Sequence, residues 1–331
     1  MKPRIFVAIA SYADPELPRT LHDCLAMAEA PEKLAFGICA QQDPEAPIDL
    51  SEFEADPRFR FIARSVFESR GGPWARNLAQ SLWRGEPYTL QVDAHMKFER
   101  DWDGKLIDML ESLPAAKPVV TMNAPLFHYD AQGQLHCRRD MGVPTTRVNG
   151  WNAEFGWAPW FDFGPPNRQN PGRTRFINGN FAFSRGVWNV EVPQDPEHYY
   201  WGEEFSITVR SFTWGYDLFL PREVVAWHML HTEAPPRRHW EHGEAVIRRR
   251  NATAFERLRR LVYSDGGDSL GPYGLGPHRS LRAYEQYAGF DLAGKRAHPD
   301  VFTGANPDPV TLHGPEDWSR CITMDQAQGL L

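Results

Sequence analysis

Asp93 and His95 are the residues of this sequence whose types and spacing most directly suggest chemistry. They follow an apolar run at residues 88–92 and are separated by a single alanine. In an extended segment, residues i and i+2 point to the same side, so both side chains can reach one metal ion. A carboxylate with an imidazole suits Mn²⁺ first, with Mg²⁺ or Zn²⁺ as alternatives. Such an ion can neutralise the charge of a departing diphosphate.

A third ligand has to come from far along the chain. His228 follows the apolar residues 224–227 and is the best candidate, with His231 three positions later as the alternative. Taken alone, His228 would be interpreted as a hydrogen-bonded core histidine. The Asp93 and His95 pair, taken alone, would be interpreted as a turn with an exposed histidine. Together the three residues predict a metal site.

Two further groups of polar residues stand at the expected starts of helices. Arg76 lies one turn into a helix that opens with Gly-Gly-Pro, where it can meet an anion, although a solvent-exposed arginine is the simpler alternative. Trp201 and a glycine precede the adjacent carboxylates Glu203 and Glu204. Compensation of the helix dipole explains such carboxylates without any functional role. The functional interpretation is that one of them accepts hydrogen bonds from sugar hydroxyls or lies close to the reacting carbon.

The elements that must position these residues alternate through the first 125 residues. Apolar runs predict strands over residues 5–10, 34–40, 59–64, 88–92 and 118–122. Helical spacing predicts helices over residues 17–30, 73–83 and 103–113. This order is typical of an α/β fold with a mostly parallel central sheet flanked by helices. Such sheets bind ligands beyond the carboxyl ends of their strands, which is where the segments after residues 10 and 92 lie.

The regular pattern weakens between residues 127 and 174. Residues 151–163 are rich in aromatics, which favours an acceptor-binding loop, with a structural plug over the sheet as the alternative. Further on we expect helices over residues 203–214 and 241–262 and strands over residues 218–221 and 224–227. The segment from residue 264 onward is rich in Gly and Pro and is expected to wrap the surface.

These patterns predict a large domain over residues 1–263 and a C-terminal extension over residues 264–331. Within the domain, a donor half that binds the donor substrate would cover about residues 1–125. An acceptor half that binds the acceptor substrate would cover about residues 126–263.

Composition excludes several classes of protein. The net charge is −7, so no basic face for nucleic acid is expected. Four cysteines stand far apart, at positions 24, 39, 137 and 321, which argues against a zinc ribbon or a disulfide scaffold. The first apolar run is too short to insert in a membrane. We therefore predict a cytoplasmic protein.

Three segments, in this order, resemble one family of glycosyltransferases. They are IFVAIASYADPEL near the start, GGPWARNLAQSLWRGEPYTLQVDAHMKFERDWD in the middle, and WGEEFSITVRSFTWGYDLFLP followed by AWHMLH. The family includes the cytoplasmic polypeptide (hydroxyproline) α-N-acetylglucosaminyltransferases. The last segment is also similar to mucin-type polypeptide N-acetylgalactosaminyltransferases, which share a D-x-H site. One departure is Ala13, which stands where the family's first loop often has an arginine.

The resemblance implies a GT-A fold, UDP-GlcNAc as donor, a divalent metal, retention at the anomeric carbon, and a hydroxyl acceptor on a polypeptide or glycan. It implies that the metal is held by Asp93, His95 and His228. It implies that the nucleotide-sugar, with the uridine at the first loop and the diphosphate near the arginine, contacts Ala10, Ser11, Tyr12, Arg76, Val92, Asp93 and Ala94. It implies that the transferred sugar and the acceptor face Trp201, Glu203 and Glu204.

Several alternatives stay open from the sequence. Glu203 or Glu204 could act as a nucleophile, although attack from the face of the leaving group is favoured, with these residues as sugar binders. Another UDP-sugar, or a small natural product as acceptor, would fit the same residues. A zinc hydrolase built on Asp93, His95 and His228, or a non-catalytic sugar-binding protein, are the alternatives from other classes.

Overall fold

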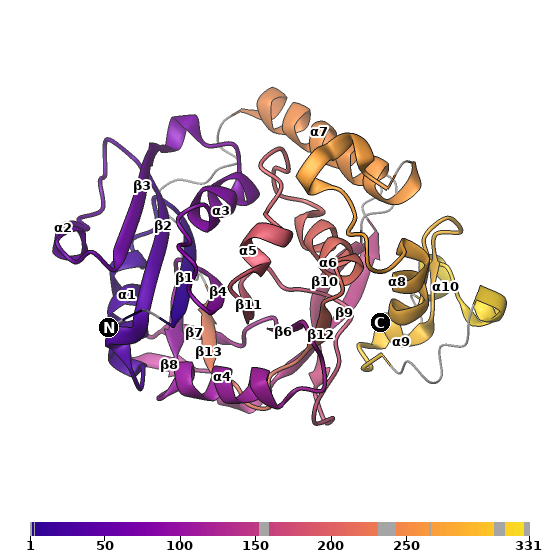
Figure 1. Cartoon of the computed structure of the whole chain (residues 1–331), viewed down its shortest axis with the longest axis horizontal. Helices are drawn as coiled ribbons and strands as arrows, with labels where there is room; N and C mark the ends of the chain where they lie inside the picture. The colour runs from indigo at the N-terminus through magenta and orange to yellow at the C-terminus, as the bar shows by residue number, and fades with distance from the viewer. Residues whose placement is uncertain are drawn as a thin grey trace.

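A central sheet of seven strands organises the computed structural model of this protein, which describes Lys2 and residues 4–151, 159–230, 243–264, 266–307 and 315–327. Its strand order is β12-β6-β11-β4-β1-β2-β3 (Figure 1). All pairings are parallel except those of β11, which is antiparallel to both β4 and β6. The strands are β1 (Ile5–Tyr12), β2 (Leu34–Gln42), β3 (Phe59–Ser65), β4 (Tyr88–Asp93), β6 (Pro118–Thr121), β11 (Phe181–Arg185) and β12 (Asp217–Phe219). The predicted α/β class with a mostly parallel sheet is confirmed.

The alternation of side chains along β1 builds two apolar layers. Ile5, Val7 and Ile9 belong to the core that also contains buried residues of α1 (Leu17–Met27) and α4 (Trp102–Ser112). Phe6 and Ala8, which point the other way, pack with residues of α3 (Gly72–Gln80). Figure 1 shows α3 and α4 on opposite sides of the sheet. All eight elements expected in the first 125 residues are found, and a short helix α2 (Ser51–Glu54) is added.

The second half of the sheet carries its own helices. Buried side chains of α5 (Trp188–Glu191) and α6 (Glu203–Thr213) form a cluster with Val119 of β6 and Ala182 of β11. The first residues of α6 lie near the end of β4, because Arg76 contacts both Glu203 and Asp93. This arrangement places Glu203 and Glu204 next to the strand that carries Asp93.

A smaller sheet of four strands stands beside the end of β4. Its order is β5-β13-β7-β8, with β5 (Met96–Phe98), β13 (Ala226–Met229), β7 (Leu126–Tyr129) and β8 (Leu135–Cys137). Strands β5 and β13 are antiparallel, and their register sets His228 opposite Met96. This pairing brings His228 to the turn that contains His95.

The region expected to be an aromatic loop is partly a β-ribbon. Strands β9 (Pro144–Trp151) and β10 (Pro159–Pro166) pair in antiparallel fashion with irregular register. The sequence obscured these strands because Gly and Pro, which usually mark turns, stand among the aromatic and β-branched residues that favour strands. Residues 152–158 of the expected loop, and His231, lie outside the described residues.

Residues after 264 contribute buried side chains to a core that they share with the main domain, which corrects the expectation that they wrap the surface. Tyr284 and Phe290 are fully buried and pack with Phe176 and Phe205 of the main domain. Aromatic and aliphatic residues spaced between the glycines supply this core. Helix α7 (Glu244–Tyr263) precedes this segment, whose own elements are α8 (Leu281–Ala288), β14 (Phe290–Asp291), β15 (Arg296–Ala297), α9 (Pro299–Thr303) and α10 (Met324–Ala327).

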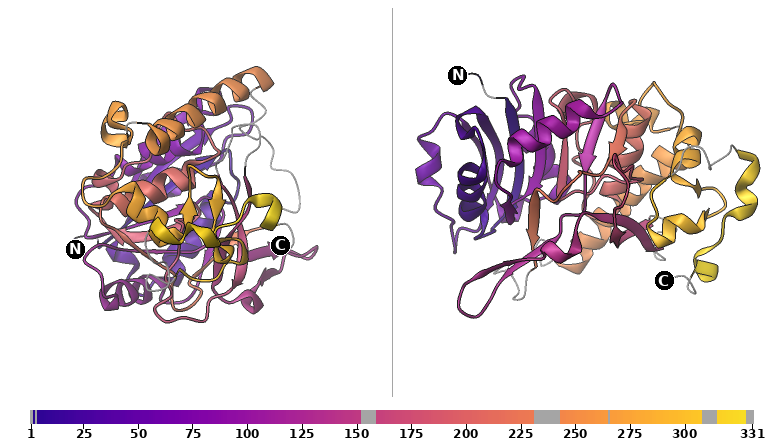
Figure 2. Two further views of the ribbon diagram at one scale, coloured as in Figure 1. Left: turned by 90° about the vertical axis from the view of Figure 1, so that its right-hand side faces the viewer. Right: turned by 90° about the horizontal axis from the view of Figure 1, so that it is seen from below.

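The C-terminal elements lie at the end of the molecule opposite the N-terminal strands (Figure 2). Across the described ranges, no helix combines the length and the apolar character that crossing a membrane would require.

Candidate active site

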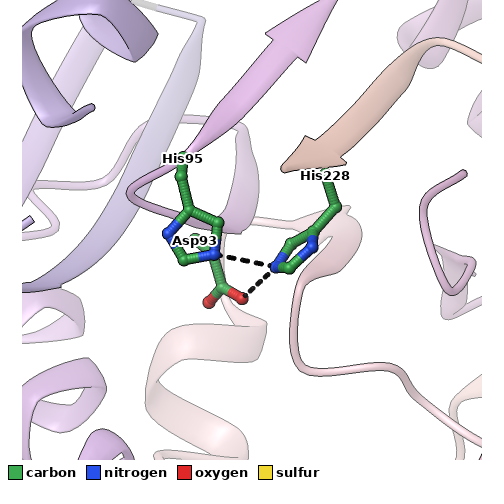
Figure 3. Close-up of side chains that lie close together, drawn as sticks. All are labelled: Asp93, His95 and His228. Atoms are coloured by element: carbon green, nitrogen blue, oxygen red, sulfur yellow. Dashed lines mark hydrogen bonds and ion pairs between the residues drawn. The ribbon is translucent and has the colours of Figure 1, made fainter. Parts of the chain in front are cut away.

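Asp93, His95 and His228 converge at the end of β4, as Figure 3 shows. One ligand atom from each lies within 4.8 Å of the others. The two Nε2 atoms of the histidines are 2.9 Å apart, and Nε2 of His228 is 3.3 Å from Oδ2 of Asp93. We call these three residues the metal end of the site.

Backbone geometry explains why these side chains meet. Asp93 is the last residue of β4, and the turn that follows brings the chain into β5 at Met96. The N–H of Met229 donates to the carbonyl of His95 at 3.0 Å, which fixes β13 against this turn. His228 therefore faces the same space as Asp93 and His95.

The donor set of the metal end fits a divalent cation. Nδ1 of His95 lies 2.6 Å from Oδ2 of Asp14, so in the neutral ring this carboxylate favours the proton on Nδ1 and leaves the lone pair on Nε2, the atom that faces His228. Metal-binding histidines commonly have a carboxylate behind them in this way. Burial lowers the pKa of His95, but hydrogen bonding and charge from Asp14 outweigh it and raise the pKa. One carboxylate and two imidazoles suit Mn²⁺ or a related ion.

Arg76 joins the metal end to the start of α6. One guanidinium nitrogen donates to Oδ1 of Asp93 at 2.9 Å and the other to Oε1 of Glu203 at 2.8 Å. Burial raises the pKa of Asp93, but the charge of Arg76 and contacts from His228 outweigh it and hold this pKa well below its usual range. Asp93 thus remains ionised, with one oxygen used by Arg76 and the other facing the histidines.

A pocket of about 360 Å³ opens beside the metal end. Asp93 and His228 line it, as do Pro159 and Phe161 of β10. Its volume is in the range of small-molecule sites. Its lining also includes Tyr200, Trp201, Glu203 and Glu204, which we call the pocket end.

The adjacent carboxylates of the pocket end have different surroundings. Glu203 is buried and paired with Arg76. Glu204 is partly exposed to the pocket, and its Oε1 accepts the N–H of Gly179 at 2.7 Å. Within the described part of the chain, Glu204 forms no ion pair. Burial, together with the charge of Glu203, raises the pKa of Glu204 to about 7.

The residues predicted to contact the nucleotide surround the end of β1. Ala10 pairs with Asp93 across the parallel strands β1 and β4. Ser11 is buried, and its carbonyl accepts the side-chain amide of Gln41 at 3.0 Å. Tyr12, the last residue of β1, is partly exposed.

Val92 and Ala94 flank Asp93 but offer little side-chain surface. Val92 is fully buried in the sheet, and Ala94 is nearly so. The carbonyl of Ala94 accepts the hydroxyl of Thr20 at 2.8 Å. These two residues can therefore serve a ligand mainly by fixing the backbone around Asp93.

Several residues of the site were missed in the sequence. Asp14 stands in the first loop, where its proximity to His95 gives no sequence signal. Gly179 lies against Arg76, and a Cβ at this position would come within 2.7 Å of a guanidinium nitrogen. Tyr200 lines the pocket, as does Phe161, which belongs to the aromatic segment expected to bind an acceptor. Only the predicted neighbourhood of Trp201 and Glu203 pointed toward Tyr200.

The sequence matches the model of a family described as "Glycosyltransferase (GlcNAc)" over residues 4–60 and 48–294. No curated protein matches it. Among solved structures, one of GalNAc-T7 with UDP, GalNAc and Mn²⁺ superposes with a TM-score of 0.53 at 14% identity. That alignment covers 85% of this chain and 54% of GalNAc-T7, so this chain spans about half the length of that relative. This likeness shows a shared fold.

A mannosyltransferase, PcManGT from Pyrobaculum calidifontis, in complex with GDP-Man and Mn²⁺, matches with a TM-score of 0.45 and 15% identity, over 89% of this chain and 78% of that one.

Proposed function

This chain belongs to the GlcNAc glycosyltransferase family and is a glycosyltransferase with a GT-A-like fold, and from that premise we propose that it transfers N-acetylglucosamine from UDP-GlcNAc to a hydroxyl acceptor with retention of configuration. The acceptor hydroxyl would be carried by a polypeptide or a glycan. The observation that carries the proposal is the convergence of Asp93, His95 and His228 beside a pocket that holds two further carboxylates.

The metal end would hold a divalent cation, with Mn²⁺ first and Mg²⁺ as the alternative. Asp93, His95 and His228 supply one oxygen and two nitrogen ligands. When bound, the ion supplies positive charge beside the diphosphate of the donor. The structure of GalNAc-T7 contains Mn²⁺ together with UDP, which supports the choice of ion.

The carboxyl ends of β1 and β4 would hold the nucleotide. Ala10, Ser11 and Tyr12 lie at this edge of the sheet, and such edges are where parallel sheets bind ligands. Arg76 uses two N–H donors on Asp93 and Glu203. A guanidinium has five donors, so Arg76 keeps the capacity to contact a phosphate oxygen as well.

The pocket end would hold the sugar and the attacking hydroxyl. Glu204 faces the pocket and would accept hydrogen bonds from sugar hydroxyls, beside the ring of Trp201. Glu203 is tied to Arg76 and is poorly placed to act as a nucleophile. Retention is then best served by attack from the leaving-group face. The bond from the anomeric carbon to the phosphate oxygen breaks, the bond to the acceptor oxygen forms, and the hydroxyl proton passes to the departing phosphate.

A calorimetric titration tests the donor half of this proposal. UDP and UDP-GlcNAc are titrated into the metal-free protein with and without Mn²⁺, using wild type and the double variant Asp93→Ala/His95→Ala. We expect binding that requires both Mn²⁺ and the two side chains. His136→Ala, which removes a surface histidine paired with Asp130, is the matched control and should bind as wild type does.

Two results would contradict the proposal. Binding of UDP that is independent of metal and of both side chains would exclude the metal end from donor recognition. Hydrolytic activity that needs zinc and no nucleotide would identify the same residues as a hydrolase. With donor binding in hand, transfer of radiolabelled GlcNAc to mixtures of peptides, glycans and small hydroxyl compounds identifies the acceptor class.

A further inference from the structure

Asp14 is held between two contacts at the end of β1. Its Oδ2 lies 2.6 Å from Nδ1 of His95, and its Oδ1 accepts the N–H of Glu16 at 2.9 Å. The side chains of Asp14 and His95 are 13% and 17% exposed, so solvent competes only weakly for this contact. The carboxylate therefore has a fixed orientation behind the imidazole.

The contact determines which nitrogen of His95 can bind a ligand. A neutral imidazole carries one N–H, and the other nitrogen is the acceptor. A carboxylate beside Nδ1 keeps the proton there and leaves the lone pair on Nε2. Nε2 is the atom that faces His228, at 2.9 Å. A negative charge behind the ring also makes Nε2 a stronger donor to a cation.

The surrounding backbone keeps Asp14 and His95 in register. The hydroxyl of Thr20, on α1, donates to the carbonyl of Ala94 at 2.8 Å and accepts the N–H of Met96 at 2.9 Å. These two residues flank His95, so α1 is attached to the turn on both sides of it. The turn that bears Asp14 leads directly into the same helix.

We propose that Asp14 is a positioning residue that presents Nε2 of His95 to the metal ion. The proposal rests on the proposed function, because it assumes that the metal end binds a divalent cation. Asp14 itself does not touch the ion. Its role is to fix the tautomer and the orientation of one ligand, and the Thr20 contacts keep the two chain segments at the required distance.

Mn²⁺ binding to the full chain, measured by calorimetry without any nucleotide, tests this role. Asp14→Ser keeps a short oxygen that can accept the N–H of Glu16 but cannot reach His95. We expect its affinity for Mn²⁺ to fall by about 10- to 100-fold. Asp14→Asn keeps an acceptor for the Nδ1 proton and loses the charge. Its affinity for Mn²⁺ should therefore lie between that of Asp14→Ser and that of wild type.

The exposed pair Asp130 and His136 supplies the matched control. Its carboxylate oxygen lies 2.8 Å from Nε2 of the histidine, in a hairpin away from the metal end. Asp130→Ser should leave the affinity for Mn²⁺ unchanged. Thermal unfolding of the metal-free variants checks that each is folded. ¹⁵N-histidine NMR reports the tautomer of His95, which should be Nδ1–H in wild type and mixed in Asp14→Ser.

The outcomes separate this role from the function on which it rests. Mn²⁺ affinity of Asp14→Ser equal to that of wild type would overturn the positioning role and leave the metal site standing. Should Asp14→Ser fail to fold, Asp14→Asn decides, and affinity equal to wild type would again overturn the role. A wild-type protein that binds no Mn²⁺ would overturn both the role and the proposed function.

Discussion

The metal end and the pocket end border one pocket but are held in different ways. At the metal end, side chains outside the metal-binding set fix two of the members: Asp14 contacts His95, and Arg76 contacts Asp93. At the pocket end, Glu204 has a backbone N–H as its partner and Tyr200 is 47% exposed. The metal end is thus fixed before any ligand arrives, and so is Glu203 through Arg76, whereas the half-exposed Tyr200 has room to adjust.

This difference suggests that the two ends have different functions. A metal site needs its ligands at defined distances, so prior fixation lowers the cost of binding. A pocket that must accept both a sugar and a second substrate gains from aromatic walls, which offer contact area without strict geometry. We therefore expect changes at the metal end to abolish turnover and changes at the pocket end to alter substrate affinity.

The largest effect is expected from Asp93→Ala. The change removes a metal ligand and leaves Arg76 without one of its two partners. Loss of several kcal/mol of charge stabilisation corresponds to a decrease of about 10³-fold in kcat/KM. Steady-state transfer assays measure this, with Asp130→Ala as control. A decrease of less than tenfold would remove the distinction between the two ends.

Gly179→Ala tests the link between the ends. A Cβ here would lie 2.7 Å from one guanidinium nitrogen of Arg76 and would displace the group from Asp93 and Glu203. We expect the free energy of unfolding to fall by about 1–3 kcal/mol and Mn²⁺ affinity to fall about tenfold. Gly150→Ala, where a Cβ meets nothing within 4 Å, is the control. Unchanged Mn²⁺ affinity would show that the ends are independent.

The pH dependence of stability should distinguish Glu204 from the ionised metal end. Its pKa is raised from 4.5 to about 7, so between these pH values the folded protein keeps a proton that the unfolded chain has lost. This contribution to stability is complete below about pH 4.5 and is lost as the pH rises through 7. Glu204→Gln cannot ionise at this position and does not lose this contribution. Relative to metal-free wild type, its free energy of unfolding should therefore increase as the pH rises from 5 to 8. Chemical denaturation at several pH values measures this, and parallel curves would contradict it.

The smallest effect is expected from Tyr200→Ala. Tyr200 packs edge-on against Trp201, with ring centroids 4.9 Å apart, and half of its surface is already exposed. We expect the KM for the acceptor to rise a few-fold, with kcat nearly unchanged and stability altered by no more than about 1 kcal/mol. Phe67→Ala removes another exposed aromatic, away from the pocket lining, and should leave KM unchanged. A large loss in kcat would contradict the expected difference between the pocket end and the metal end.

The elements of the fold differ in how far they could be predicted from the sequence. Strands β1 to β4 and helices α1, α3 and α4 were predictable, because buried strands show apolar runs and helices show a period close to 3.6. The C-terminal core around Tyr284 and Phe290 was not, because its apolar residues are spaced by Gly and Pro without a clear period. The ribbon of β9 and β10 was hidden for the same reason.

The sequence by itself determined that Asp93 and His95 share one side of the chain, since that relation depends only on backbone geometry two residues apart. It also marked the start of α6, through the glycine before Glu203 and Glu204. Only the tertiary structure decided that His228 joins them, because the register between β5 and β13 is a long-range pairing. It also decided that Glu203 and Glu204 differ, since Arg76 reaches one and Gly179 the other. Periodicity is local and can be read along the chain, whereas contacts between distant segments depend on how the whole sheet assembles.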